Sequence, residues 1–203
     1  MLTSLRFSSA RGRKASKSAR YFSFVFDRSI VTNLLEEHVK YVSDTTCKIR
    51  LLLSRIGNVT ITSEKIDLPR DDIPLIVAIS NKTTDSSDPS YFHKTTMRDL
   101  YQSELARCQR ELGCFDVLFT NERGELTEGC FTNLIIEKNG LYLTPPIDSG
   151  LLNGIYRQEF IDNNEKDVRE KCLFPADLRD ADRIYLCNSV RGLIQVHLTE
   201  KSV

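Results

Sequence analysis

Two side chains near the middle of the sequence, Lys94 and Glu128, are of types that could perform chemistry together. Lys94 stands in His93-Lys94-Thr95-Thr96-Met97-Arg98, and Glu128 follows 34 positions later in Gly124-Glu125-Leu126-Thr127-Glu128-Gly129. A lysine amine can attack a carbonyl carbon where partial burial and a nearby cation favour its uncharged form. A carboxylate can hold a proton on a bound base. Taken alone, however, Lys94 resembles an exposed lysine at a helix start and Glu128 a polar turn residue. The hypothesis therefore depends on the elements that carry them.

The composition excludes several classes of partner. The chain has 203 residues, which is enough for one large domain or two small ones. Its 28 Lys and Arg residues equal its 28 Asp and Glu residues, so there is no net field to attract nucleic acid or an anionic membrane. No apolar run approaches the roughly 20 residues of a spanning helix. We expect neither nucleic acid nor a membrane as a partner.

The cysteines and histidines do not predict a metal site. Six cysteines contain no C-x-x-C pair, and the three histidines are scattered. Most of the cysteines lie in apolar surroundings, which favours small buried side chains in a reducing cytosol. We therefore expect no bound metal. The cysteines are Cys47, Cys108, Cys114, Cys130, Cys172 and Cys187.

The first twenty residues contain basic side chains and no acidic one. Ser is abundant there, and this composition is typical of an organellar transit peptide. The same stretch could instead form a basic, solvated helix that leads into the aromatic segment 21–26. The basic residues are Arg6, Arg11, Arg13, Lys14, Lys17 and Arg20.

The first part of the chain predicts a small α+β unit. Residues 29–42 have helical spacing, and 48–53 and 59–62 are typical of two strands joined through Gly57-Asn58. Residues 74–79 form an apolar run that fits a third, buried strand. The polar stretch 81–90 resembles a linker. We therefore expect one domain over residues 1–84 and a larger one over residues 85–203.

The second part predicts one long helix followed by antiparallel strands. Residues 96–112 have helical spacing, and Gly113 is a suitable end. Strands are expected at 115–120, 131–137 and 141–143, with a turn at 121–124. A further helix is expected from residue 155, after Gly154, followed by a strand near 168, a turn at 175–178 and strands at 183–186 and 193–198.

Five motifs between residues 91 and 198 resemble those of the fold-type IV (class IV) pyridoxal-phosphate enzymes. In chain order they are H-K-T-T-x-R, G-E-L-T-E-G-x-x-T-N-L, T-P-P, S-G-L-L-x-G-I-Y-R and N-S-V-R-G. The first and last motifs most resemble those of the aminodeoxychorismate lyases. The resemblance implies an α+β, two-domain fold-type IV architecture like that of D-amino-acid aminotransferase. It also implies that the small N-terminal domain is shortened.

The resemblance assigns a pyridoxal phosphate site to named residues. Lys94 matches the lysine that binds the cofactor's aldehyde, and Glu128 matches the glutamate that faces its ring nitrogen. The phosphate would be held by the backbone of Ile155 and Tyr156 at a helix start and by Ser189 with Val190 on a turn. Tyr156 stands where the aminotransferases commonly have threonine.

Three basic residues complete the predicted site. Arg98 and Arg191 could each meet a substrate carboxylate or lie on the surface. Lys14 falls where the family's H-L-x-R-L-x-x-S-A pattern has its phosphate-binding arginine, and it keeps the charge without the two-pronged geometry. A second register, ending at Ser8, places Ser4 there instead. Because residues 18–26 already fit the first register, we expect a cytoplasmic protein more than an organellar one.

The resemblance implies a lyase that converts 4-amino-4-deoxychorismate to 4-aminobenzoate and pyruvate, a step toward folate. Two alternatives stay open: an aminotransferase of branched-chain or D-amino acids, and a catalytically inactive domain. The family also implies a homodimer, and the subfamily implies aminodeoxychorismate synthase as a partner.

Overall fold

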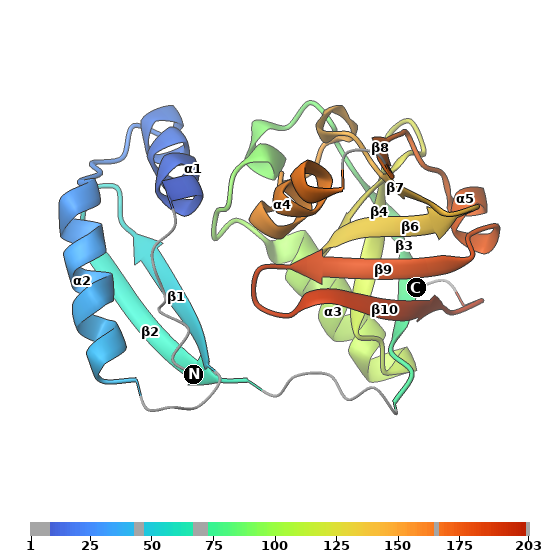
Figure 1. Cartoon of the computed structure of the whole chain (residues 1–203), viewed down its shortest axis with the longest axis horizontal. Helices are drawn as coiled ribbons and strands as arrows, with labels where there is room; N and C mark the ends of the chain where they lie inside the picture. The colour runs from blue at the N-terminus through green and yellow to red at the C-terminus, as the bar shows by residue number, and fades with distance from the viewer. Residues whose placement is uncertain (1–8, 43–46, 67–72, 165–166, 202–203) are drawn as a thin grey trace. The chain divides into compact units, whose positions relative to one another are not determined.

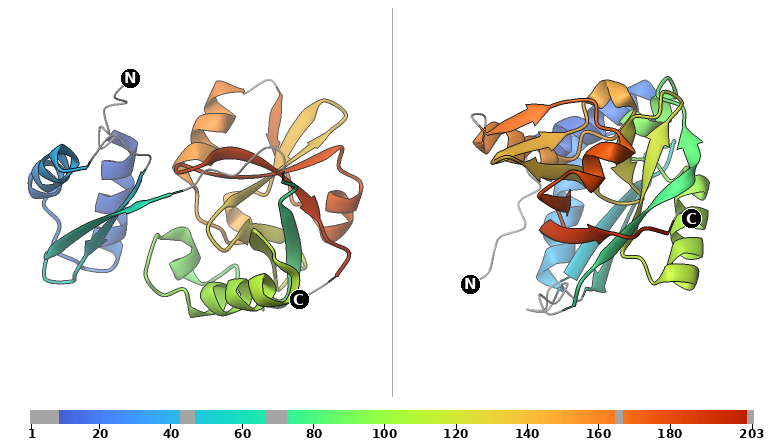
Figure 2. Two further views of the ribbon diagram at one scale, coloured as in Figure 1. Left: turned by 90° about the horizontal axis from the view of Figure 1, so that it is seen from below. Right: turned by 90° about the vertical axis from the view of Figure 1, so that its right-hand side faces the viewer.

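The computed structural model describes residues 9–42, 47–66, 73–164 and 167–201. The chain divides into two compact units, residues 1–68 and residues 69–203, and each is described here by itself (Figures 1 and 2). Over the described ranges, no helix is long and apolar enough to cross a membrane.

The first unit contains two helices and a β-hairpin. Its elements are α1 (Ser9–Tyr21), α2 (Arg28–Lys40), β1 (Cys47–Leu53) and β2 (Val59–Lys65). The predicted hairpin is confirmed: Leu53 pairs with Val59, and Gly57 has the positive φ of 91° that its turn requires. Helix α2 begins where the Asp27 side chain accepts hydrogen bonds from the amides of Ser29 and Ile30 at 2.8 and 3.1 Å.

The second unit is built on eight strands. They are β3 (Ile76–Thr84), β4 (Asp116–Asn121), β5 (Leu126–Gly129), β6 (Asn133–Lys138), β7 (Leu141–Thr144), β8 (Val168–Glu170), β9 (Arg183–Asn188) and β10 (Gly192–Leu198). Its helical elements are η1 (Pro89–Phe92), α3 (Asp99–Leu112), η2 (Ile147–Ser149), α4 (Ile155–Asn163) and α5 (Pro175–Arg179).

Six of these strands form a closed ring. The order along the sheet is β5-β4-β3-β10-β9-β6-β7-β8, and β5 also pairs with β6. One residue pair, Glu128 with Asn133, makes that closing contact. Strand β3 is parallel to both β4 and β10, and the other pairs in the ring are antiparallel. The sheet is therefore mixed, whereas the strands in this part of the chain were predicted to be antiparallel.

Two apolar clusters cover the two faces of β3 and β4. One cluster includes Val77 and Leu118 and extends over the other strands of the ring and α5. The other includes Ala78 and Val117 and packs against Tyr101 and Cys108 of helix α3. This alternation is expected for strands with both faces buried. Helix α3 ends at Gly113, as predicted, with a left-handed φ of 68°.

The predicted domain boundary differs from the observed one. Strand β3 was expected to belong to the small domain, with a linker at 81–90. It pairs instead with β4 and β10 of the second unit, and it continues to Thr84. Its apolar run correctly predicted a buried strand, but a run of this kind does not specify its partners. The division falls after residue 68 and not after residue 84.

The cysteines correct a second prediction. Cys108 and Cys114 form a disulfide with a Cα–Cα distance of 5.6 Å, across the turn from α3 to β4. Their spacing in the sequence gave no sign of it, because Gly113 is what turns the chain back. Cys130 and Cys187 are free and buried, as expected, whereas Cys172 is exposed. Burial raises the pKa of the Cys187 thiol to about 12.

Candidate active site

Glu128 lies at the centre of a hydrogen-bonded group in the second unit. It belongs to strand β5 and not to a turn, and it is only 4% exposed. Its Oε1 accepts a hydrogen bond from the Tyr101 hydroxyl at 3.2 Å. Its Oε2 accepts from the Leu152 amide at 3.2 Å and the Asn133 side-chain amide at 3.4 Å. Each carboxyl oxygen is thus oriented by the fold.

The surroundings of Glu128 favour its protonated form. Burial raises the pKa of this carboxyl to about 8, although the charges of Arg98 and Lys94 and the Leu152 and Tyr101 hydrogen bonds oppose the rise. Even with the charges of Arg98 and Lys94 nearby, Glu128 therefore retains a proton at neutral pH. A group of this kind can share its proton with a basic nitrogen placed beside it.

A pocket of about 240 Å³ opens onto Glu128. Its other lining residues come from η1, the following loop and the start of α3: Asp88, Ser90, Tyr91, His93, Thr95, Met97, Arg98, Asp99, Leu100 and Tyr101. Lys94 lies between two of them in the chain, and its charge acts on Glu128. Lys94 itself is not among the residues that line the pocket, and its interaction with Glu128, 34 positions later in the sequence, is one of charge.

The exposure of Lys94 differs from the expectation. Partial burial was predicted for this side chain, but it is exposed because it stands in the loop between η1 and α3. The nearby cation that was expected is present four residues later as Arg98, which is half-buried.

Arg98 is held against the turn between β5 and β6. One of its Nη atoms donates a hydrogen bond to the carbonyl oxygen of Cys130, and its guanidinium lies 4.6 Å from the centre of the Tyr101 ring. The carbonyl occupies only part of the guanidinium's donor set. Arg98 is therefore held at the pocket wall with donors left for a second acceptor.

A buried carboxylate, Asp116, organises the turn between β5 and β6. Its Oδ1 accepts from the amides of Val117 and Cys130 at 2.8 and 2.9 Å. Its Oδ2 accepts from the Thr132 hydroxyl at 2.7 Å and the Phe131 amide at 3.4 Å. Burial raises the pKa of Asp116 to about 6, with these hydrogen bonds opposing. The turn it holds joins Glu128 to Asn133.

The same turn is also contacted by the end of β9 and by the segment that follows it. The Asn188 side-chain amide donates to the Phe131 carbonyl at 3.3 Å, and the Arg191 guanidinium lies 5.7 Å from the Phe131 ring centre. Arg98 and Arg191, the two predicted carboxylate-binding residues, therefore contact adjacent residues of one turn.

The start of helix α4 is tied to Glu128 through Asn133. The Asn133 amide also donates to the Leu152 carbonyl at 2.8 Å. A Cβ on Gly154 would lie 2.0 Å from the Asn133 Oδ1, so only glycine fits there. No side chain in the described part of the chain caps α4. The amides of Ile155 and Tyr156 thus begin a helix without a side-chain acceptor, which suits an anion.

The turn at 188–192 lies beside this helix start. A Cβ on Gly192 would lie 3.7 Å from the Tyr156 ring. Burial raises the pKa of the Tyr156 hydroxyl, and a hydrogen bond with the Leu193 backbone opposes this. The hydroxyl oxygen thus accepts from the β10 backbone, and Tyr156 keeps its O–H and its backbone amide as donors for an anion.

The other two predicted phosphate-binding residues are Ser189 and Val190. The backbone amide of Val190 already donates a hydrogen bond within the turn. The Val190 amide donates to the Asn188 Oδ1 at 2.9 Å, as does the Arg191 amide. This asparagine turn shapes the segment, but it leaves the Val190 amide already bonded. The Ser189 side chain is exposed.

A buried arginine supports the loop that precedes α4. Arg157 is 1% exposed and donates to the Pro145 carbonyl at 2.7 Å and to Glu170 Oε1 at 2.6 Å. It also contacts Thr144 Oγ1 and Asn153 Oδ1, both at 3.2 Å. The T-P-P stretch and α4 are held together by this one side chain.

The sequence interpretation did not identify four residues that shape the site. Asn133 and Arg157 were inside quoted motifs, so a signal existed for them. Tyr101 was indistinguishable from a core residue of α3, and Asp116 lay at the start of an apolar run. Only the folded arrangement shows what they contact.

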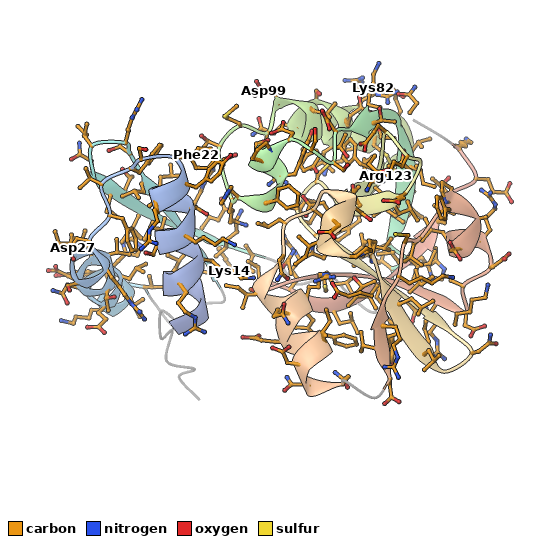
Figure 3. The ribbon with its side chains drawn as sticks, turned by 90° about the horizontal axis from the view of Figure 1, so that it is seen from above. Lys14, Phe22, Asp27, Lys82, Asp99 and Arg123 are labelled. Atoms are coloured by element: carbon orange, nitrogen blue, oxygen red, sulfur yellow. A yellow bond between two sulfur atoms is a disulfide. The ribbon has the colours of Figure 1, made fainter. Side chains whose placement is uncertain are left out.

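Lys14 lies on helix α1 of the first unit (Figure 3). The prediction that it holds a phosphate stays a prediction.

The comparison with protein families identifies the chain. The family model described as amino-transferase class IV matches residues 14–198. The chain belongs to this family. Its enzymes include pyridoxal-phosphate-dependent aminotransferases and lyases, which agrees with the five motifs.

Two curated relatives carry different names. The chain is 28% identical to "Putative aminodeoxychorismate lyase" of Schizosaccharomyces pombe over 88% of this chain and 77% of that protein. It is 32% identical to "Probable branched-chain-amino-acid aminotransferase" of Thermotoga maritima over 69% of this chain, but only 52% of that protein.

Solved structures confirm the predicted fold-type IV class. A "Putative amino-acid aminotransferase" from Mesorhizobium loti has a TM-score of 0.83 and 31% identity, covering 92% of this chain and 89% of that one. A "Putative 4-amino-4-deoxychorismate lyase" from Legionella pneumophila has a TM-score of 0.81 and 21% identity, covering 97% and 78%. At that identity, the second likeness supports the fold alone.

Proposed function

We propose that the chain binds pyridoxal phosphate and acts as a 4-amino-4-deoxychorismate lyase. The observation that carries the cofactor assignment is a buried, proton-holding Glu128 that lines a pocket and on which the charge of Lys94 acts. The family membership supplies the chemistry that such a pair serves.

The donor set fits this cofactor at three points. Glu128 can face the ring nitrogen, because its carboxyl is buried and holds a proton to share. Lys94 supplies the amine for the aldehyde. The uncapped start of α4 offers the amides of Ile155 and Tyr156 to the phosphate. Ser189, on the turn at 188–192, would add a further donor. When bound, the cofactor withdraws electrons from the substrate carbon that bears the amino group.

The chain's own residues then have distinct tasks. The Glu128 carboxyl keeps a proton at the ring nitrogen, and Tyr101 and Asn133 keep that carboxyl oriented. The Lys94 Nζ removes the proton from the amine-bearing ring carbon. Arg98 and Arg191 hold substrate carboxylates from two sides of the 129–132 turn. Loss of this proton makes the ring aromatic as its C–O bond breaks and the electron pair leaves with the enolpyruvate oxygen. The protonated Lys94 then returns a proton to the methylene carbon of enolpyruvate, which gives pyruvate.

Of the two curated relatives compared above, the extent of the likeness favours the lyase over the aminotransferase. The Schizosaccharomyces relative aligns with 88% of this chain, whereas the Thermotoga aminotransferase aligns with 69% at somewhat higher identity. An aminotransferase is the second candidate, favoured by the 31% identity to the Mesorhizobium structure.

A product assay separates these two functions. We expect the chain supplied with pyridoxal phosphate to convert aminodeoxychorismate to 4-aminobenzoate and pyruvate in equal amounts, measured by chromatography. Lys94→Ala should abolish the reaction, and the control Lys82→Ala should not. Amino-group transfer to a 2-keto acid without 4-aminobenzoate would overturn the lyase and support the aminotransferase.

The wider setting follows from the proposed reaction. A cytoplasmic homodimer that receives its substrate from aminodeoxychorismate synthase would place the chain in folate precursor synthesis. Sedimentation at several protein concentrations tests the dimer, and co-purification with the synthase tests the partner.

A further inference from the structure

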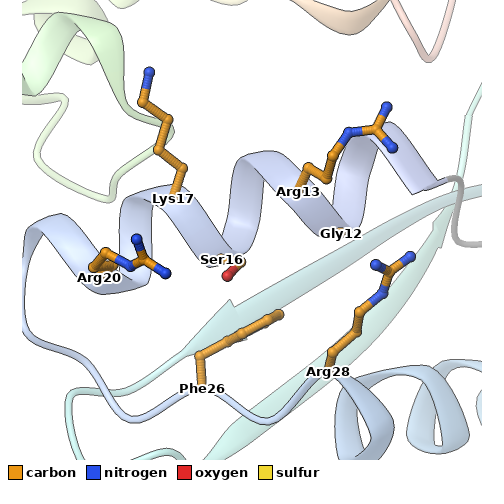
Figure 4. Close-up of a pocket in the computed structure, with 7 residues that line it drawn as sticks. All are labelled: Gly12, Arg13, Ser16, Lys17, Arg20, Phe26 and Arg28. Carbon is orange, nitrogen blue, oxygen red and sulfur yellow. The ribbon is translucent and has the colours of Figure 1, made fainter.

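The first unit has a pocket of its own, of about 440 Å³ (Figure 4). It is lined by Gly12, Arg13, Ser16, Lys17, Arg20, Phe26 and Arg28. Four of these seven side chains are cationic, and none is acidic. The volume is within the roughly 300–1,000 Å³ that small-molecule sites occupy.

Helical spacing gathers most of the pocket's polar groups on one stripe. Residues 13, 16, 17 and 20 of α1 follow the i, i+3, i+4, i+7 pattern, which confines them to an arc of about 100°. Gly12 adds no side chain beside them. Lys14, the predicted phosphate ligand, does not line the pocket. The pocket therefore uses a different set of side chains on the same helix.

The other side of the pocket is formed by the segment that leads into α2. Figure 4 shows Ser16 pointing from α1 toward Phe26, and Arg28 pointing from the start of α2 toward α1. Phe26 is half-buried, whereas Arg20 and Arg28 are exposed. An apolar surface thus lies among hydrogen-bond donors.

The positive charge of the pocket is not balanced within its unit. None of the four cationic side chains forms an ion pair in the described residues. Asp27 is next to Arg28 in the chain, but its carboxylate accepts the amides of Ser29 and Ile30 and so caps α2. Like charges brought together in this way repel one another until an anion binds.

We propose that this pocket binds a small ligand that carries at least two phosphate or carboxylate groups. Planar guanidinium groups form paired hydrogen bonds with either kind of anion, so Arg20 and Arg28 would hold the charged groups. The Ser16 hydroxyl adds a donor, and Phe26 contacts the carbon part of the ligand. This binding does not depend on the proposed lyase activity.

A small ligand fits the observations better than a nucleic acid or a membrane. Nucleic acids and anionic membranes bind extended basic surfaces and need no concavity. Here the unpaired cations surround a concavity with an aromatic side chain.

Calorimetric titration of the full chain, without cofactor and at low salt, tests the proposal. Sodium pyrophosphate and sodium citrate are the probes, and the tighter of the two shows whether phosphates or carboxylates are preferred. We expect one binding site per chain. Arg20→Gln combined with Arg28→Gln should weaken binding at least about tenfold. The control, Arg50→Gln with Arg110→Gln, removes the same charge from exposed arginines outside the pocket and should change affinity less than about twofold.

A second variant and two further titrations make the test decisive. Ser16→Asp places a carboxylate in the pocket without removing an arginine, and it should weaken binding similarly. Saturating pyridoxal phosphate should leave binding unchanged, and so should Lys94→Ala. Binding of neither probe, equal weakening in the control, or displacement by pyridoxal phosphate would overturn the proposal. Pocket-dependent binding of RNA or anionic vesicles, without binding of the small probes, would also overturn it.

Discussion

At the scale of single residues, the proton on Glu128 follows from where the carboxyl lies. Its pKa is about 8 in the folded chain against an ordinary value of 4.5, and burial is the main cause. Between these two values the unfolded chain has released the proton and the folded chain has kept it. The folded state therefore binds more protons, and its stability falls as pH rises from about 4.5 toward 8.

Glu128→Gln should remove this pH dependence in the cofactor-free protein. Glutamine can keep the Tyr101, Asn133 and Leu152 contacts without titrating. We expect the wild type to lose about 1–3 kcal/mol of unfolding free energy relative to the variant between pH 5 and 7.5. Urea denaturation at both pH values measures it. Parallel pH profiles for the two proteins would show that Glu128 is ionised in the folded chain.

Asp116 is a positioning residue for the turn that carries Glu128 and Asn133. Asp116→Asn replaces one acceptor oxygen with a donor that faces the Phe131 amide and the Thr132 hydroxyl. We expect a loss of about 1–3 kcal/mol in unfolding free energy and weaker binding of pyridoxal phosphate. The exposed Asp167→Asn, outside the pocket, is the matched control. Unchanged cofactor affinity in a folded Asp116→Asn protein would refute the positioning role.

At the scale of elements, the loop before α4 packs closely against β6 at one point, where Gly154 approaches the Asn133 side chain. Gly154 has an ordinary negative φ of −59°, so its requirement is steric and comes from the Asn133 Oδ1. Gly154→Ala should displace Asn133 and weaken pyridoxal phosphate binding at least tenfold, about 1.4 kcal/mol.

A double-mutant cycle shows whether this steric cause is correct. In an Asn133→Ala background the added methyl group has room, so Gly154→Ala should cost much less there. Fluorescence titration with pyridoxal phosphate gives the four affinities. Equal costs in both backgrounds would contradict the contact.

The sequence predicted most elements, including the short strands β7 and β8, but it missed β5 and α5. Helices α2, α3 and α4 and the β1–β2 hairpin have clear periodicity, caps or turn glycines. Strand β5 has four residues, and its polar members gave it the pattern of a turn. Helix α5 was predicted as a turn because five residues, Pro175–Arg179, are too few to show a helical period.

At the scale of the whole molecule, the ring of strands explains why the site forms where it does. The pair that closes the ring, Glu128 with Asn133, is also the pair that contacts the loop before α4. The β5–β6 pair itself is local, across the turn 129–132, but local patterns cannot predict the rest of the ring, because β3–β4, β3–β10 and β6–β9 pair across long stretches of sequence.

The same limit explains two of the other misses. The partners of β3 and the Asp116 hydrogen bonds depend on tertiary contacts, whereas the Cys108–Cys114 disulfide depends on the local reversal of the chain at Gly113. The pairing of Lys94 with Glu128 was predicted only because the motifs resembled a known family. Their side-chain types and spacing alone would have left both as surface residues.

The measurement that tests the account most directly is covalent attachment of pyridoxal phosphate at Lys94. We predict that the wild type and the exposed-lysine control Lys82→Ala become yellow with the cofactor. Borohydride reduction should then fix its mass on the peptide that contains Lys94. Lys94→Ala should lose both the near-visible absorbance and the added mass. A wild type that stays colourless would support the inactive alternative, and a Lys94→Ala protein that keeps the covalent label would place the site elsewhere.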